Sequence, residues 1–566
     1  MNRTRCLGLA AVMVLALMMT PWIVDAATIT IVNADGAGEG FNDPTAAAPV
    51  GGNPGVTVGQ QRLNVFNQAA AIWGGLLPSP VTIVVNAQFN ALTCTATTAV
   101  LGSAGPSGIS ANFGGALVTG HWYHQALANK LSGSDLNGVT QEIGAQFNSN
   151  IGMTGCLTGS FWYYGFDHDQ GSSVDLLAVV LHELGHGLGF STTTSASNGA
   201  FFNGPPALPA VWDNFLQDRV SGLHWDQMSA AQRQASAIST GNLVWDGAVT
   251  TGMAPVLLQQ PRLLVNSPPG IAGSYIAGTA EFGISLRSDG DGVTGNLVLA
   301  TDGVATTNDG CEAFTNAGAV AGNIALVDRG NCPFTQKAQN AFAAGASALV
   351  IANNAAGVID MTGSAPGLPI SVIMISQANG NTIKAQLGGG VNGTISFDPT
   401  VHPGTSPEGK VLMYAPNPVA PGSSVSHFDV SATPNVLMEP AISSDLTDEV
   451  DLTRYLFEDI GWMVGNTSVP PPGAGTAIAL RGVPNPFRTT TQMRVNLASA
   501  GMVELTVLDI GGRSVRQLVR SWMPAGQHLV TWDGTDGEGH SLPSGVYLTR
   551  LKTGSASVTQ RIVRME

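Results

Sequence analysis

Charged residues are scarce in this chain of 566 residues: they make up 11% of it, whereas an average soluble protein has about 25%. Disorder driven by charge is excluded, because 44% of the residues are hydrophobic. Basic residues are the scarcer kind, with 23 Lys and Arg against 38 Asp and Glu and a formal net charge of −15. An acidic chain is not suited to a phosphate backbone, so the composition excludes a nucleic-acid partner.

Long hydrophobic runs are also lacking, apart from one at the N-terminus. Two arginines precede an apolar run from about Leu7 to Met19, and residues 24–26 resemble a small-residue cleavage site. The run is shorter than the roughly 20 apolar residues that a membrane span needs. Residues 1–26 are therefore predicted to be a secretory signal peptide, the alternative being an uncleaved membrane anchor. No later segment has the pattern of a membrane span, so we expect a secreted, extracellular protein without an integral membrane segment.

Cysteine is sparse, with five residues in the whole chain, and Cys6 belongs to the predicted signal peptide. The four that remain are an even number in an exported chain, which favours two disulfide bonds over free buried thiols. Four cysteines allow three connectivities. Their positions favour Cys94–Cys156 and Cys311–Cys332, because each pair then lies within one predicted domain.

The length predicts three to four domains at about 150 residues each. The first part has an α+β pattern: a strand at 28–32, a helix at 60–73 with apolar residues three and four apart, and a strand at 81–85. Loops rich in Gly, Ser and Asn follow until about residue 172.

The pattern changes between about residues 282 and 399. A strand at 324–327, a helix at 335–344 and a strand at 348–351 follow one another, which implies a parallel crossover. A Pro-rich linker at 467–476 then separates a last domain of short alternating strands and turn clusters. We expect a β-sandwich for that domain.

The segment that carries chemistry is residues 172–190, SSVDLLAVVLHELGHGLGF. Ser172, with Asp175 three residues on, resembles a helix N-terminal cap, and an apolar stripe would anchor the helix in a core. His182 and His186 are four residues apart, so both imidazoles project from one face and can share one Zn²⁺. Glu183 lies one step round the helix, where its carboxylate can take a proton from water. The alternative is a pair of solvated or core histidines.

A catalytic zinc needs a third protein ligand. In the compact pattern HExxHxxGxxH that ligand would be residue 192, which is Thr192 here, and no Glu occurs between Glu183 and Glu281. The candidates are therefore Asp213 and His224 nearby, and a histidine far downstream, His427.

The motif His182-Glu183-x-x-His186-x-x-Gly189, a long insertion, and then Ser426-His427 with Met438 and Pro440 resembles the leishmanolysin-like metzincin zinc metalloproteases over about residues 28–462. The resemblance implies a metzincin-like zincin domain in which His427 is the third zinc ligand. It also implies that Met438 is the Met-turn residue, packed under the histidines and not bound to the metal. The chain departs from the family in having Phe428 in place of a Trp, a longer insertion, and no cysteine between the predicted signal peptide and Cys94 to act as an inhibitory switch.

Two further resemblances concern the rest of the chain. Residues 325–334, ALVDRGNCPF, and the strand at 350–354 are similar to protease-associated (PA) domains, which implies a lid or recognition module with no catalysis of its own. Residues 485–487, 507–513 and 532–534 resemble Ig-like type IX sorting and hook-capping-like modules, which implies contact with export machinery or a cell surface. In both cases the alternative is a passive accessory domain.

These resemblances predict the following order of parts. It comprises a signal peptide (1–26), a first part of the metzincin-like catalytic domain (27–281), an inserted α/β PA domain (282–399), a second part of the catalytic domain (400–466), a linker (467–476) and an all-β Ig-like domain (477–566).

The expected function is that of a secreted zinc metalloendopeptidase, a hydrolase of protein or peptide substrates with Glu183 as general base and water as nucleophile. The alternative is a non-enzymatic exported adhesin or binding protein on a degenerate protease scaffold. A Ca²⁺ ion at Asp289-Gly-Asp291 or at residues 533–536 is a further, weaker expectation, since neither segment has the spacing of an EF-hand and turns explain both.

Overall fold

The computed structural model describes residues 26–463, apart from 139, 169, 203–206, 281, 284–285, 287–291, 305–306, 362, 364, 366–367, 444–445, 447 and 449, and residues 479–564, apart from 484–486, 489, 498–500, 510–512, 524–525, 538 and 554–555. The predicted signal peptide up to Asp25 and the Pro-rich linker lie outside these residues. The chain divides into two compact units, Met1–Val464 and Gly465–Glu566, which are described separately. Within the described ranges, no helix combines the length and the apolar character that crossing a membrane requires.

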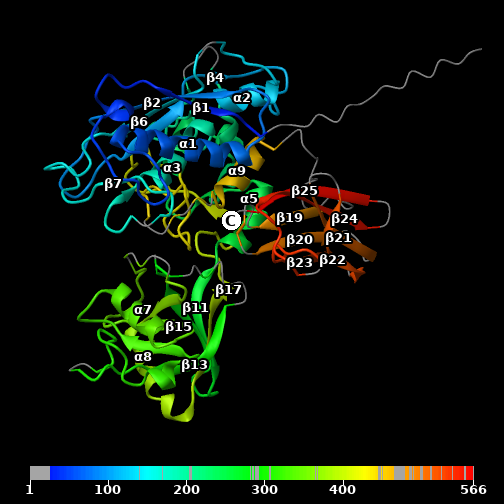
Figure 1. Ribbon diagram of the computed structural model, residues 1–566. Helices are drawn as coiled ribbons and strands as arrows, with labels where there is room; N and C mark the ends of the chain where they lie inside the picture. Colours follow the sequence, from blue (N-terminus) through cyan, green and yellow to red (C-terminus); the bar gives the residue numbers. More distant parts are fainter. Residues whose placement is uncertain are drawn as a thin grey trace, which may run out of the picture. The chain divides into compact units, whose positions relative to one another are not determined.

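The first unit begins with a four-stranded sheet in the order β1-β2-β6-β3. β1 (Ile29–Asn33), β2 (Ile83–Asn90) and β6 (Ile143–Asn148) are parallel, whereas β3 (Gly102–Pro106) is the antiparallel edge strand. Helix α1 (Val58–Leu76) connects β1 to β2 and packs on one face of the sheet (Figure 1). Parallel strands joined by a helical crossover make this part α/β, so the predicted α+β class is wrong. The sequence pattern shows where strands occur, but not in which direction they pair.

Helix α3 (Leu176–Leu188) lies beside α1 against the same sheet (Figure 1). Its first six residues are all apolar and buried, so the helix runs through the core of the unit. The indole Nε1 of Trp73 on α1 donates a hydrogen bond to the carbonyl of Leu181 at 3.0 Å. This bond and the apolar packing fix the part of α3 that precedes its two histidines.

Both ends of α3 have well-defined caps. The N-cap is Asp175, whose carboxylate accepts from the N–H of Leu177 at 2.8 Å; the prediction that Ser172 begins the helix is wrong by three residues. At the other end Gly189 has a φ of 131°, a conformation that glycine adopts readily, and the chain turns away there.

A small antiparallel sheet in the order β18-β10-β9 follows α3. β10 (Leu243–Trp245) pairs with β9 (Leu216–Asp218) and with β18 (Val411–Leu412). Because the inserted barrel lies between β10 and β18 in the sequence, the chain leaves this part and returns to it at neighbouring strands. Helices α5 (Ala248–Leu257) and α9 (Thr453–Ile460) pack against each other nearby.

The other elements of this part are short. They are η1 (Gly40–Asn42), β4 (Ile109–Ser110), β5 (Tyr123–His124), α2 (Gln125–Ser132), β7 (Trp162–Tyr163), β8 (Val174–Asp175), η2 (Val211–Asn214), η3 (Trp225–Gln227) and α4 (Ala230–Ser236).

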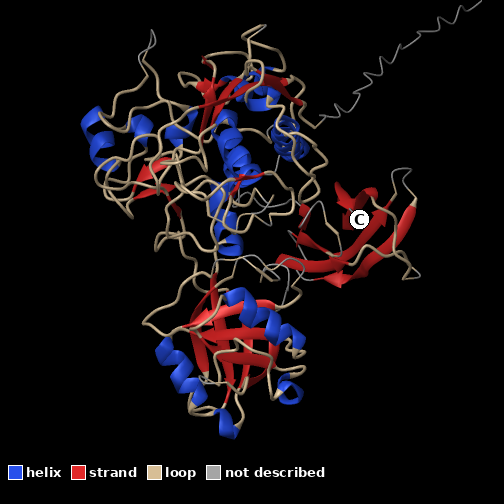
Figure 2. Ribbon diagram, turned by 60° about the vertical axis from the view of Figure 1, so that its left-hand side comes forward, coloured by secondary structure: helices blue, strands red, loops and turns tan. Residues whose placement is uncertain are grey.

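Between α5 and β18 the chain forms a closed barrel in the order β11-β12-β16-β15-β14-β13-β17. It begins at Gln260, earlier than the residue 282 from which the inserted domain was predicted. Helices lie around its outside (Figure 2). The elements are β11 (Gln260–Ser267), β12 (Gly273–Gly278), β13 (Val293–Leu299), α6 (Ala317–Val320), β14 (Ile324–Asp328), α7 (Phe334–Ala343), β15 (Ala348–Ala352), β16 (Ser371–Ile375), α8 (Gln377–Lys384), η4 (Leu387–Gly389) and β17 (Asn392–Asp398). β14, α7 and β15 form the parallel crossover that the hydrophobic pattern predicts.

The second unit consists of two antiparallel sheets, in the orders β19-β20-β23 and β22-β21-β24-β25. Its core includes Leu505, Trp532 and Leu551. This agrees with the all-β sandwich predicted for the last domain. The strands are β19 (Ala479–Val483), β20 (Thr491–Leu497), β21 (Gly501–Leu508), β22 (Ser514–Met523), β23 (Gly526–Trp532), β24 (Gly545–Thr553) and β25 (Ala556–Arg564).

Candidate metal centre

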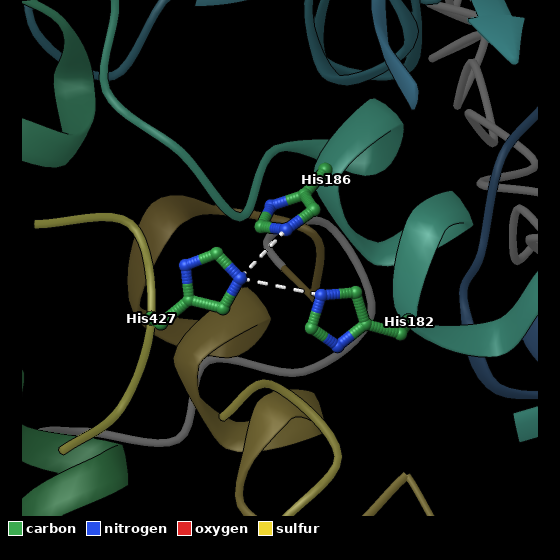
Figure 3. Close-up of side chains that lie close together, drawn as sticks. All are labelled: His182, His186 and His427. Carbon is green, nitrogen blue, oxygen red and sulfur yellow. Dashed lines mark hydrogen bonds between the residues drawn. The ribbon is translucent and has the colours of Figure 1, made fainter. Parts of the chain in front are cut away.

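Three histidines from distant parts of the sequence meet in the first unit (Figure 3). The Nε2 atom of His427 lies 3.2 Å from Nε2 of His186 and 3.2 Å from Nε2 of His182. Two of the rings come from successive turns of α3, and the third comes from a segment 245 residues after His182. The structure therefore brings together the three residues that the sequence motif and the resemblance named.

The opposite nitrogen of each ring faces a backbone carbonyl. Nδ1 of His182 is 2.7 Å from the oxygen of Leu437, Nδ1 of His186 is 2.8 Å from that of Phe190, and Nδ1 of His427 is 2.8 Å from that of Ser423. A carbonyl oxygen only accepts, so each Nδ1 carries the proton and donates it. In a neutral ring Nε2 is then a bare lone pair, and three such lone pairs point at one place.

Burial keeps these rings neutral. It lowers the pKa of His182 to about 3 and that of His186 to about 4, and it holds the pKa of His427 well below its usual range. Converging lone pairs repel one another unless a cation lies between them. Two nitrogens on one tetrahedral zinc, at about 2.0–2.1 Å each, are about 3.3–3.4 Å apart, close to the spacing of the Nε2 atoms. The donor set therefore fits a zinc ion with three imidazole ligands.

Glu183 lies next to this set and is 8% exposed. Its Oε2 accepts a hydrogen bond from the backbone N–H of Ala104, on the edge strand β3, at 2.8 Å. Burial raises the pKa of the carboxyl to about 7, and the Ala104 N–H opposes that rise. A cation held by the histidines would also favour the ionised form.

Met438 packs beneath the histidine-bearing helix. A Cβ built on Gly185 would lie 2.8 Å from the sulfur of Met438, so a larger residue at that turn of α3 would require the thioether to move. The carbonyl of Met438 accepts from the N–H of Phe428, and the N–H of the preceding Leu437 donates to Asp451 at 2.6 Å. The methionine segment is thus tied both to Phe428, the residue after His427, and to Asp451 just before α9.

The two nearby alternatives for the third ligand lie elsewhere. Asp213 is buried and accepts hydrogen bonds from two threonines, one of which is Thr192. His224 forms a 2.8 Å ion pair with Asp246, which raises its pKa. Neither residue belongs to the cluster of possible metal ligands that contains His182.

Of the two acidic segments considered for Ca²⁺, Asp289 and Asp291 lie outside the described residues. Asp533 accepts from the backbone N–H and the hydroxyl of Thr535 within a turn, as expected of a turn segment. A further acidic cluster, Asp302 with Asp309 and Glu312, was not foreseen from the sequence. The buried ammonium of Lys337 neutralises it in part, since it interacts with all three carboxylates.

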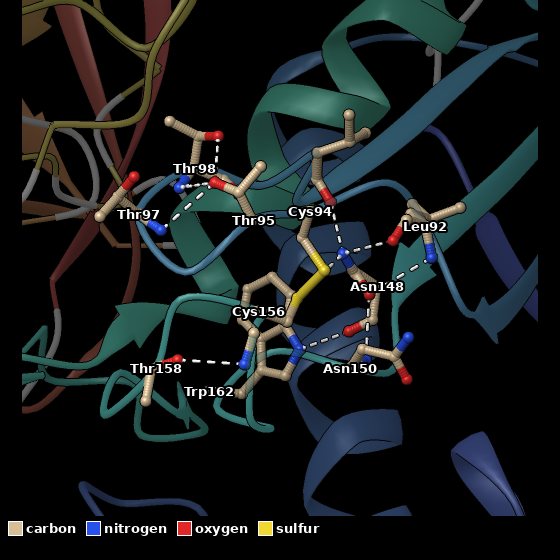
Figure 4. The surroundings of a disulfide bond; sticks show 12 residues. Leu92, Cys94, Thr95, Thr97, Thr98, Asn148, Asn150, Cys156, Thr158 and Trp162 are labelled. Atoms are coloured by element: carbon tan, nitrogen blue, oxygen red, sulfur yellow. Dashed lines mark hydrogen bonds between the residues drawn. A yellow bond between two sulfur atoms is a disulfide. The ribbon is translucent and has the colours of Figure 1, made fainter.

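Both predicted disulfides are present, Cys94–Cys156 and Cys311–Cys332. Around the first, the amide of buried Asn148 donates to the carbonyl of Val100 at 2.9 Å, and the indole of Trp162 donates to the carbonyl of Asn148 at 2.8 Å (Figure 4). This disulfide therefore joins the loop that leads into β3, and so toward Ala104, to the loop after β6.

The residues that sequence reasoning missed act through their backbones. The N–H of Ala104 and the carbonyls of Phe190, Ser423 and Leu437 hold the four functional side chains. A backbone group leaves no signature in the amino-acid type, so no signal in the sequence points to these positions.

Comparison with protein-family models identifies two segments. Residues 293–383 match the PA domain, and residues 485–557 match the FlgD Ig-like domain. The first match falls within the barrel and the second within the C-terminal unit.

Among curated proteins, the chain is 33% identical over 129 residues to signal peptide peptidase-like 3 of Arabidopsis thaliana, which is 22% of this chain and 23% of the relative. It is 54% identical over 48 residues to an aminopeptidase of Pseudomonas aeruginosa strain UCBPP-PA14, covering 8% of this chain and 9% of the relative. Among solved structures, a zinc aminopeptidase from Bacillus subtilis aligns at 20% identity with a TM-score of 0.18, over 33% of this chain and 42% of that one. The chain thus spans less than a quarter of the length of these curated relatives.

These comparisons contradict two predictions. The curated peptidase of Pseudomonas aeruginosa that matches the chain is an aminopeptidase, as is a probable lipoprotein aminopeptidase of Mycobacterium tuberculosis, and not a leishmanolysin-like metzincin. The assignment of the chain to that family is therefore wrong, and so is the metzincin-like fold class. The PA and Ig-like parts of the same prediction agree with the matched domains.

Proposed function

We propose that this protein is a zinc-dependent peptidase whose metal is held by His182, His186 and His427. The observation that carries the proposal is the convergence of three Nε2 atoms, each on a ring whose Nδ1 faces a backbone carbonyl. The names of the matched aminopeptidases support the reaction class, and that of the Bacillus enzyme supports the metal.

Zinc, when bound, supplies Lewis acidity, which polarises a peptide carbonyl and makes a water molecule more acidic. Glu183 is the general base: its carboxylate takes a proton from the attacking water and gives it to the leaving amine. The Ala104 N–H holds that carboxylate in place. Since no side chain attacks the substrate, no acyl-enzyme forms.

Two cleavage modes are supported by different observations. The edge strand β3 lies beside Glu183 and offers backbone groups along which an extended peptide can lie, with chain on both sides of the cleaved bond. This supports an endopeptidase. The names of the relatives support instead an aminopeptidase, which removes N-terminal residues.

The setting that we propose is extracellular. Two disulfides suit an oxidising compartment, and the N-terminal pattern suits export. Protein or peptide substrates are then the partners of the first unit, and the FlgD Ig-like domain is the part that would contact export machinery or a cell surface.

The test of the mechanism is Glu183→Gln in the mature protein. Zinc content and thermal stability should stay close to wild type, while casein digestion should fall by about 10²–10⁴-fold, the usual contribution of a general base. Glu142→Gln is the matched control, because Glu142 is another buried glutamate that accepts backbone and amide hydrogen bonds away from the histidines. A Glu183→Gln protein that digests casein normally contradicts the mechanism. Wild type that binds zinc and cleaves no peptide supports the adhesin alternative.

The cleavage mode is tested with one peptide in two forms, with a free and with an acetylated N-terminus. An endopeptidase cuts both forms at an internal bond, and mass spectrometry finds one N-terminal and one C-terminal fragment from each. An aminopeptidase shortens only the free form, one residue at a time.

A further inference from the structure

Asp213 is a fully buried carboxylate in η2, the short turn of helix at Val211–Asn214. Its Oδ1 accepts from the hydroxyl of Thr192 at 2.6 Å. Its Oδ2 accepts from the hydroxyl of Thr194 at 2.5 Å and from the backbone N–H of Ala210 at 2.9 Å. Burial raises the pKa of this carboxyl, and its donors together with Arg233 oppose the rise. Both oxygens are therefore used to hold the chain segment that follows α3.

That segment reaches the support of His186. The carbonyl that fixes the His186 ring belongs to Phe190, two residues before Thr192. The Thr192 hydroxyl also accepts from the N–H of Thr194 at 2.9 Å, so the loop is closed on the side of Asp213. Because Thr192 is only two residues from Phe190, a movement of Thr192 would also move the Phe190 carbonyl that fixes the His186 ring.

The same segment reaches the third histidine from another side. The N–H of Thr192 donates to the hydroxyl of Ser426, the residue before His427, at 3.3 Å. The neighbour of Asp213, Trp212, donates from its indole to the carbonyl of Val425 at 3.2 Å. The Asp213 carboxylate is thus linked to the supports of two histidines. Through Thr192 it is linked to the segment that carries the Phe190 carbonyl, and through Thr192 and Trp212 of η2 it is linked to the residues just before His427.

We propose that Asp213 is a positioning residue of the metal centre. It holds Thr192 and η2, and so keeps the rings of His186 and His427, 241 residues apart in the sequence, close enough to bind the same ion. The inference goes beyond the proposed function in assigning a role to a residue that does not touch the metal, and it rests on that function only in taking the three histidines as the zinc site.

The test compares Asp213→Asn, Asp213→Ala and Thr192→Val with wild type. Val has the shape of Thr and keeps the backbone N–H, so Thr192→Val removes the hydroxyl alone, and with it the bond to Asp213 and the bond accepted from the N–H of Thr194. Zinc affinity is measured by competition with a chromogenic chelator, and thermal stability is measured on the metal-free proteins. All three variants should bind zinc about 10–100-fold more weakly, the usual effect of losing an outer partner of a metal site.

The matched control is Asp459→Asn. Asp459 on α9 is a half-buried carboxylate with a similar set of donors, and its hydrogen bonds go to Trp245, Val249 and Thr250 rather than to the segments that hold the histidines. It should lose stability like Asp213→Asn, yet bind zinc within about threefold of wild type. If Asp213→Ala fails to fold, Thr192→Val still decides.

Variants that lose stability but bind zinc as tightly as wild type overturn the inference and leave the proposed function intact. Wild type that binds no zinc overturns the proposed function itself, and with it the role of Asp213.

Discussion

The inserted barrel and the metal centre are built in opposite ways along the chain. The barrel is one continuous segment, from Gln260 to Asp398, and these two end residues are register partners in β11 and β17. The centre is discontinuous: two of its histidines precede the barrel and the third follows it. The chain closes this gap through β10 and β18, which pair directly on either side of the insertion.

This difference shows that ligands can lie far apart in the sequence and still bind the same ion. A domain whose ends meet can be inserted between two ligands without moving them, because the flanking strands keep their pairing. The centre should therefore depend on contacts within the parts of the first unit that flank the barrel, and the barrel should depend on its own core. The two sides of this contrast can be tested separately.

The largest effect is expected for the ligand that comes after the barrel. His427→Ala should weaken zinc binding by about 10²–10³-fold, a quarter of the binding free energy of a four-ligand site, and abolish peptidase activity. His224→Ala, the control, removes an ion pair with Asp246 and should leave zinc content unchanged. Zinc is measured by elemental analysis after dialysis. The reverse outcome would identify His224 as the third ligand. All three ligands would then precede the barrel, and the metal centre would not be discontinuous.

Removing each disulfide should affect a different region, the metal centre in one case and the barrel in the other, and the expected effects are somewhat smaller. Cys94–Cys156 spans 62 residues and Cys311–Cys332 spans 21, for which the loop-entropy model gives about 4 and about 3 kcal/mol of stability. Replacing the first pair by serines should also lower activity, because its loop leads into β3 and the Ala104 N–H that holds Glu183. Replacing the second pair should destabilise the barrel alone. Activity on a short peptide and denaturant unfolding are the measurements, and equal loss of activity in both variants would contradict the contrast.

How far the sequence could predict these regions follows the same division. One helix carries His182, Glu183 and His186 within five positions, and their spacing in the sequence was enough to identify them. His427 required a resemblance, and the family inferred from that resemblance is contradicted by the comparisons. Strand direction is non-local, which is why an α+β pattern was expected where β1, β2 and β6 are in fact parallel.

Asp213 shows a second limit of sequence reasoning. An acidic residue soon after an HExxH helix has the right chemistry for a ligand and also for a buried hydrogen-bond acceptor. The two roles differ only in what lies around the carboxylate, here Thr192 and Thr194 in place of a cation. The backbone partners of the histidines are beyond the reach of such reasoning, because their side chains play no part.

A smaller effect on stability, which depends on pH, is expected at the N-terminal end of α3. His168 lies between Asp175, the N-cap of α3, at 2.6 Å and Asp448 at 2.9 Å. Burial alone would lower its pKa, but the hydrogen bonds to the two carboxylates outweigh burial and raise the pKa to about 10. Because the folded pKa is raised, this stabilisation is fully present below the unfolded value of about 6.5 and is lost as the pH rises through about 10.

His168→Gln should therefore lower the free energy of unfolding by about 1.5–3 kcal/mol at pH 6, the range for hydrogen bonds to a charged group. The difference from wild type should shrink between pH 6.5 and 10 and vanish above that. Urea unfolding at several pH values measures it. A difference that stays constant with pH would mean that His168 acts by packing and not by charge.

The smallest effect is the most demanding test of the contrast. Deleting residues 260–398 and joining Gln259 to Pro399 through two glycines should leave zinc affinity within about threefold of wild type. Two residues suffice, because the removed ends are register partners, whose Cα atoms lie about 4.5–5.5 Å apart in an antiparallel pair. Leu258 and His402 remain on either side of the join, and their 3.0 Å hydrogen bond holds the ends together.

Circular dichroism shows whether the shortened chain folds, and chelator competition gives its zinc affinity. The same shortened chain carrying His427→Ala is the control, and it should lose zinc as the full chain does. If the shortened chain folds but binds zinc much more weakly, the barrel takes part in the centre, and the separation inferred from the pairing of β10 with β18 is wrong. If it binds zinc normally and cleaves a short peptide but not casein, the barrel acts on large substrates only, since the centre would then be complete without it.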